Sequence, residues 1–126
     1  MMNTAQALPI PAAAAVLTKA VCSAAQRLGL KNRELALVVG TSEASVSRLS
    51  SGREVDPDSK EGELALLFLR LFRSLDALVG GDDHKARAWL QAPNAHLGNV
   101  IPQERILTVE GLVDVVQYLD AMRGRI

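Results

Sequence analysis

The chain has 126 residues, of which 48% are apolar and only 3% aromatic, so its core must be built mainly from leucine, valine and alanine. This composition favours helices over a β-sandwich. The 14 lysines and arginines balance 14 aspartates and glutamates, which excludes a strongly basic protein that holds nucleic acid by bulk charge. The single cysteine excludes a framework of disulfides within the chain. With only two isolated histidines beside it, the sequence predicts neither a metal site nor a cofactor.

Hydrophobic spacing predicts six helices. They run over residues 12–28, from 31 or 32 to Gly40, over 43–49, from 59 or 62 to 79, over 85–90, and from 108 to about 122. Ser42 and Asp82 stand where side chains cap helix N-termini. No helix is predicted over residues 95–107. The polar stretch 53–62 contains Pro57 and predicts a boundary between two domains, 12–58 and 59–126.

The apolar segments do not predict membrane or secretory targeting. No basic residue precedes the first apolar stretch, and Pro9 and Pro11 interrupt it, so we expect a lead-in to the first helix. Leu64–Val79 contains three charged residues and is shorter than a bilayer span of roughly 20 residues. We therefore expect a buried helix of a cytoplasmic protein, which also fits the cysteine usage.

Residues 28–52 have the spacing of a helix-turn-helix. Gly40 allows the tight turn, Ala36 is small where the helices cross, and a shared core is predicted from Leu35, Val39, Val46 and Leu49. The predicted solvent face carries short polar groups and one long cation: Glu43, Ala44, Ser45, Ser47 and Arg48. Such groups suit base edges and phosphates. The alternative is an αα-hairpin that never touches DNA.

The same stretch contains Leu-Gly-Leu, Glu-Leu-Ala, Gly-Thr-Ser, Val-Ser-Arg-Leu and Ser-Gly in this order, and it resembles the Xre/Cro class of repressor DNA-binding domains. The resemblance implies that Asn32 contacts phosphate and that four residues face the major groove: Ser42, Glu43, Ala44 and Arg48. From their location, Arg33 and Arg53 are expected to contact the DNA backbone.

Charge is unevenly distributed along the chain. Residues 19–53 carry six cations and two acids, a net +4, whereas residues 61–126 carry seven cations and nine acids, a net −2. The positive field therefore lies at the helix-turn-helix. Because the excess is small, we expect weak DNA binding by one protomer, with a dimer or a partner needed for useful affinity.

Leu64–Phe72 is apolar at eight of nine positions, so this helix must bury more than one face. We expect a two-fold dimer whose interface includes Leu64, Leu67, Phe68, Leu71 and Phe72. The third helices of the two copies, residues 43–49, could then contact two half-sites of the operator DNA that lie roughly 34 Å apart. The alternative is a central helix surrounded by the other helices of one protomer.

The second half contains Trp89-Leu90, Pro93-Asn94, Leu97-Gly98, Pro102 and a closing helix from Gly111 to Tyr118-Leu119. This pattern resembles the toxin-binding domain of the Xre/MbcA/ParS antitoxins. With the first module, the resemblance spans nearly the whole chain. It implies an all-α homodimer that neutralises a NAD-degrading, RES-domain toxin and represses its own operon. From the residues alone, Trp89 is expected to be a core anchor, and Gly98 permits a positive φ or a close backbone approach.

The chain ends in an amphipathic helix and two arginines. The resemblance implies that this end approaches the active site of the toxin, and we expect toxin contacts from Tyr118, Met122, Arg123, Arg125 and Ile126. A guanidinium suits an acidic or phosphate-binding pocket, so Arg123 or Arg125 is expected to enter it. The alternative is that both arginines stay in water and offset the helix dipole.

Catalytic motifs are not evident. His84 follows two aspartates as an exposed helix start, Cys22 has apolar neighbours, and Gly80-Gly81 is a helix stop rather than a phosphate loop. An enzyme is therefore not expected. The alternative to an antitoxin is a plain dimeric helix-turn-helix transcriptional repressor, whose second half only dimerises or senses a ligand.

Overall fold

The computed structural model describes residues 10–124. All regular elements in this part of the chain are helical, which confirms the predicted all-α class. In chain order they are α1 (Ile10–Leu28), α2 (Asn32–Val39), α3 (Glu43–Ser47), the 3-10 turn η2 (Arg48–Ser51), α4 (Lys60–Leu78), α5 (Asp83–Gln91), the 3-10 turn η3 (Ala95–Leu97), α6 (Pro102–Arg105) and α7 (Val109–Gly124).

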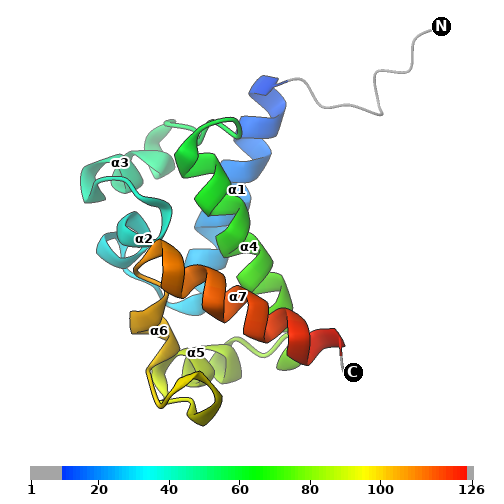
Figure 1. Cartoon of the computed structure of the whole chain (residues 1–126). Coiled ribbons are helices and arrows are strands. Elements are labelled where there is room, and N and C mark those ends of the chain that lie inside the picture. The colour runs from blue at the N-terminus through cyan, green and yellow to red at the C-terminus, as the bar shows by residue number, and fades with distance from the viewer. Residues whose placement is uncertain (1–9, 125–126) are drawn as a thin grey trace, which may run out of the picture.

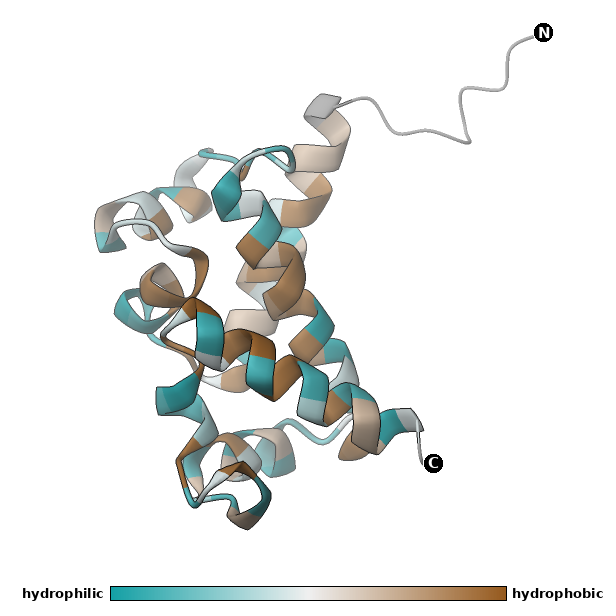
Figure 2. Cartoon of the chain, in the orientation of Figure 1, coloured by the Kyte–Doolittle hydropathy of each residue, from teal (hydrophilic) through white to brown (hydrophobic). Residues whose placement is uncertain are grey.

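The long helix α4 is the centre of the fold. It packs against α1, α2, α5 and α7, so its neighbours come from both halves of the chain. Figure 1 shows α1 and α4 side by side, α7 crossing α4, α2 and α3 on one flank, and α5 with α6 at the far end. Figure 2 shows hydrophobic (brown) segments on both α4 and α7 where the two helices cross. The residues buried on these helices include Phe68 and Leu71 of α4 and Leu112, Val115 and Leu119 of α7.

The burial of α4 corrects the expected dimer interface. Phe68 and Leu71 are 0% exposed and Leu64 is 6% exposed within a single protomer. These three side chains cannot meet a second copy without unfolding, so the expectation was wrong for them. Leu67 and Phe72 are half-buried and pack against the same core. Helix α4 is apolar on more than one face, and helices of its own chain, α1, α2, α5 and α7, cover those faces.

Local signals set most helix boundaries. The Ser42 side chain accepts a hydrogen bond from the Ser45 N–H at 3.1 Å, and the Asp82 carboxylate accepts one from the Lys85 N–H at 3.1 Å, as N-caps do. Gly40 ends α2 at φ 73°, in the left-handed region that glycine adopts most readily. These predictions are confirmed, except that the third helix is shorter and continues as the 3-10 turn η2.

The stretch 95–107 is more ordered than its sequence suggests. The Asn94 side chain accepts a hydrogen bond from the His96 N–H at 2.9 Å and begins η3, and Pro102 begins the one-turn helix α6. Both elements are too short to show helical periodicity in the sequence. Gly98 has φ 75°, which confirms the positive φ expected there. The non-glycine Asn99 also has a positive φ, of 62°.

No helix within residues 10–124 is long and apolar enough to span a bilayer. The same range contains no group of three or more histidine, cysteine, aspartate and glutamate side chains placed to hold a metal ion.

Candidate functional sites

The helix-turn-helix has the core that the sequence predicts. Helices α2 and α3 pack together, and η2 continues from α3. The core side chains of these three elements are buried: Leu35, Ala36, Val39, Val46 and Leu49. Leu64 of α4 lies under the turn, where a Cβ added to Gly40 would come 3.2 Å from its Cδ1. The motif is therefore held against the central helix as well as by its own contacts.

The residues expected to meet DNA lie mostly on the surface. Asn32, Arg33, Ser42, Glu43, Ala44, Ser47 and Arg48 are exposed, and Ser45 is half-buried. Ser42 is already engaged, because its hydroxyl accepts the cap bond and donates to the Ser45 Oγ at 3.0 Å. Within residues 10–124, no carboxylate forms a salt bridge with Arg33 or Arg48. Both cations are thus available to phosphate, and their contact with DNA stays a prediction.

Arg53 differs from these two arginines. It is half-buried and its Nη2 donates to Glu61 Oε1 at 2.6 Å, at the start of α4. Arg53 Nη1 and Glu61 Oε2 are buried without a hydrogen-bond partner. Its charge is balanced inside the chain, so the ion pair competes with the predicted phosphate contact.

An aromatic cluster marks the C-terminal half. The Tyr118 ring of α7 stacks on Trp89 of α5 with centroids 6.3 Å apart, and on His96 of η3 with centroids 5.9 Å apart. Trp89 is half-buried and packs against the core, as expected for an anchor. Tyr118 is half-buried and joins α7 to α5 and η3 through these contacts, and its contact with a toxin stays a prediction.

The end of α7 forms a basic hollow with α4. Met122 is half-buried and Arg123 is exposed, while Arg125 and Ile126 lie outside the described residues. Arg123 lines a hollow of about 270 Å³ together with four residues of α4: Leu66, Leu69, Arg70 and Arg73. None of these four α4 residues was predicted as a site residue. The signal for this face was the i, i+3, i+4, i+7 spacing of those four residues.

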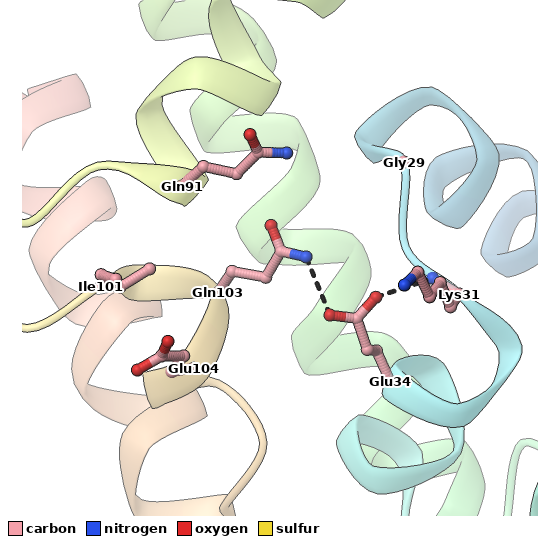
Figure 3. A pocket seen from close by; sticks show the side chains of 7 residues that line it. All are labelled: Gly29, Lys31, Glu34, Gln91, Ile101, Gln103 and Glu104. Atoms are coloured by element: carbon pink, nitrogen blue, oxygen red, sulfur yellow. Dashed lines mark hydrogen bonds between the residues drawn. The ribbon is translucent and has the colours of Figure 1, made fainter.

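A polar pocket of about 390 Å³ lies where the two halves meet, between α2 and α5–α6 (Figure 3). The Gln103 side-chain amide donates to Glu34 Oε2 at 2.8 Å, and the Lys31 backbone N–H donates to Glu34 Oε1 at 2.9 Å. Partial burial alone would raise the pKa of Glu34. The hydrogen bonds from Lys31 and Gln103 outweigh it and hold the pKa below its ordinary value.

A second junction joins α1 to α4 and α5. The Arg27 guanidinium donates to Asp83 at 2.9 Å and to Asp76 at 2.8 Å, and lies 4.7 Å from the centroid of the Phe72 ring. The hydrogen bond that Arg27 donates to Asp83 raises the pKa of Arg27. Arg87 of α5 donates to the backbone carbonyls of Arg27 and Gln26 at 2.9 and 3.1 Å. The end of α1 is thus bonded to the C-terminal half at several points.

Comparison with known families matches this arrangement. Residues 8–70 match the antitoxin Xre-like helix-turn-helix domain, and residues 74–125 match the antitoxin Xre/MbcA/ParS C-terminal toxin-binding domain. The chain belongs to the Xre-like antitoxin family. The antitoxin carries the two modules in the order that its sequence indicated. Both matched families are antitoxin families rather than enzyme families.

A solved structure agrees with both matches. A chain in the crystal structure of the M. tuberculosis MbcT-MbcA toxin-antitoxin complex has 25% sequence identity to the antitoxin and a TM-score of 0.65. The similarity covers 88% of the antitoxin and 96% of that chain, so it includes both modules. A search of curated proteins gave no match. The family matches meet inside α4, and the domain boundary expected between residues 58 and 59 stays a prediction.

Proposed function

We propose that the antitoxin neutralises a RES-domain, NAD-degrading toxin of the cytoplasm with the end of α7, and represses its own operon with the α3 face. The observation that carries this proposal is the similarity over 88% of the chain to a chain of a toxin-antitoxin complex. It spans the helix-turn-helix and the toxin-binding domain together. A protein with both modules can bind DNA and an enzyme at separate surfaces.

The toxin contact is assigned to Tyr118, Met122, Arg123, Arg125 and Ile126. Exposed Arg123 and half-buried Met122 place a cation beside an apolar group at the end of α7. An enzyme that cleaves NAD must hold a pyrophosphate and position acidic groups, and a guanidinium forms paired hydrogen bonds with either. An arginine that entered such a pocket would exclude the substrate. Burial of that charge is favourable only against a matched anion, which the pocket would supply.

Operon repression is assigned to the exposed face of α3 and η2 and to the start of α2. Arg33 and Arg48 supply cations to phosphates or base edges, and Ser47 offers a short polar side chain. The local net charge of +4 is small, because six cations are offset by two acids. One protomer would then bind weakly and a dimer would bind usefully.

The decisive experiment is co-expression with the product of the adjacent gene. We expect the two proteins to co-purify, and we expect the purified neighbour to consume NAD only when the antitoxin is absent. The matched control is the Arg33→Ala/Arg48→Ala variant, which should still inhibit the neighbour while it loses operator binding. If the antitoxin binds its promoter but neither binds nor inhibits the neighbour, the toxin assignment is wrong and the chain acts as a plain repressor.

A further inference from the structure

The hollow between α4 and the end of α7 contains, on its α4 side, the residue pattern of a knob-accepting hole. Four of its lining residues are Leu66, Leu69, Arg70 and Arg73, which follow one another at i, i+3, i+4 and i+7 along α4. Residues at these spacings are neighbours on a helix surface. In packed helix pairs, four such residues surround one side chain of the facing helix.

The same face supplies a knob. Leu66 is 53% exposed, although the other apolar residues around it on α4 are buried or half-buried. Exposed large apolar side chains are common singly, but this one lies at the edge of a hollow that would receive a leucine. A helix face with one knob and one hole can pair with a copy of itself through a two-fold axis.

The charges on this face select the antiparallel arrangement. Glu63 lies one turn before Leu66, and Arg73 lies two turns after it. When two copies of α4 run antiparallel and Leu66 enters the hole between Leu69 and Arg70, Glu63 faces Arg73 of the other copy. The two-fold axis repeats this contact, so two ion pairs flank two leucines. A parallel pair would place like charges opposite each other instead.

The charged groups are free to form these contacts. Among residues 10–124, Glu63 forms a salt bridge with Lys60 alone, at 3.0 Å. Their side chains are 64% and 81% exposed, so that pair is weak. Arg73 is exposed and forms no salt bridge within residues 10–124, and Arg123 lies beside it in the hollow. Arg70 is held by Asp120, which fixes one wall of the hole.

We propose that a second copy of this chain docks antiparallel on α4, with Leu66 of each copy seated in the other's hollow and Glu63 paired with Arg73. This inference rests on the dimeric repressor proposed above and names its interface. It differs from the dimer expected from the sequence, because Leu64, Phe68 and Leu71 belong to the protomer core. The contact is small, so the dimer is weak and salt-sensitive.

Sedimentation equilibrium of the full chain at increasing concentration tests the leucine contact. Leu66→Glu should raise the dimer dissociation constant by more than about tenfold. The matched control is Leu37→Glu, because Leu37 of α2 is also 53% exposed and lies outside this face. The control should dimerise like the wild type. A dimer that survives Leu66→Glu overturns this interface and leaves a dimeric repressor standing, whereas a strictly monomeric wild type overturns both.

A charge-exchange experiment tests the register. Glu63→Arg and Arg73→Glu should each be monomeric alone, because each places like charges opposite each other twice. Mixing the two variants should restore a dimer, since in the mixed pair residue 63 of one copy again faces an opposite charge at residue 73 of the other. Circular dichroism checks that both variants are folded. A mixture that stays monomeric, or single variants that dimerise like the wild type, contradicts the antiparallel register.

Discussion

The Glu34 carboxylate of α2 accepts a hydrogen bond from the Gln103 amide of α6 at 2.8 Å, so the helix-turn-helix is bonded to the toxin-binding domain. Its other carboxylate oxygen accepts from the Lys31 N–H, where α2 begins. Gln103 Oε1 is buried without a partner, and turning the amide over would place that oxygen against the carboxylate. Glu34 is therefore one of the ionised side chains that join the two halves of the antitoxin, together with Arg27.

The substitution Glu34→Gln should destabilise the fold in a pH-dependent way. The folded-state pKa of Glu34 is lowered, so its contribution is present above the unfolded-state pKa, near 4.3, and is lost as the pH falls through the folded-state value. We expect a loss of about 1 kcal/mol at pH 7 that shrinks towards zero in acid. Urea unfolding followed by circular dichroism measures it.

Gln103→Ala is the matched partner of that variant. Because the two side chains share one hydrogen bond, their effects should be less than additive in the double mutant. An equal loss for Glu34→Gln at pH 3 and pH 7 would contradict the assigned role of the charge.

Operator binding should depend on Arg33 and Arg48. Each alanine substitution should weaken binding by about 1–3 kcal/mol without unfolding the chain, because both side chains are exposed. Fluorescence anisotropy with promoter DNA at several salt concentrations measures the loss and the expected decrease in salt dependence. Lys85→Ala on α5 is the control, since it removes an exposed cation far from the helix-turn-helix in sequence. Unchanged binding by the double variant removes DNA contact from this face.

The last residues of the chain should act on the toxin and leave the fold intact. Deletion of residues 123–126, or replacement of Arg123 and Arg125 by alanine, should preserve helicity and operator binding, since Arg123 is exposed. It should weaken inhibition of the purified toxin and protection of cells. Wild-type inhibition by the truncated chain would place the inhibitory contact elsewhere on the 59–122 surface.

Gly111 should be essential to the C-terminal half. A Cβ at this position would lie 1.7 Å from the Arg105 carbonyl oxygen, so α6 and α7 could not keep their approach. We expect Gly111→Ala to cost at least about 2 kcal/mol and to lower the thermal midpoint. Gly124→Ala is the control, because a Cβ there meets nothing within 4 Å. Equal midpoints for the two variants would show that the backbone can relax at this contact.

The sequence by itself determined the six helices predicted from it and the helix-turn-helix, because the signals for both are local. It did not show η3 and α6, which are too short for helical periodicity. Ser42 and Asp82 cap the helices that follow them, and Gly40 ends α2 in the left-handed region. Each of these contacts spans only a few residues. The buried pattern of the motif follows from helical periodicity, so it too was visible in the sequence.

Tertiary structure decided which helices cover α4 and which charged side chains already have partners within the chain. In the sequence, the apolar residues of α4 are compatible with a dimer interface and with a core inside one protomer. The packing of α1, α2, α5 and α7 around α4 shows that they form the core of the protomer. Arg53 faces Glu61, and Glu34 meets Gln103 from 69 residues away. The hydropathy pattern shows how apolar a helix face is. Long-range packing decides which segment buries that face and which residue pairs with a given charge.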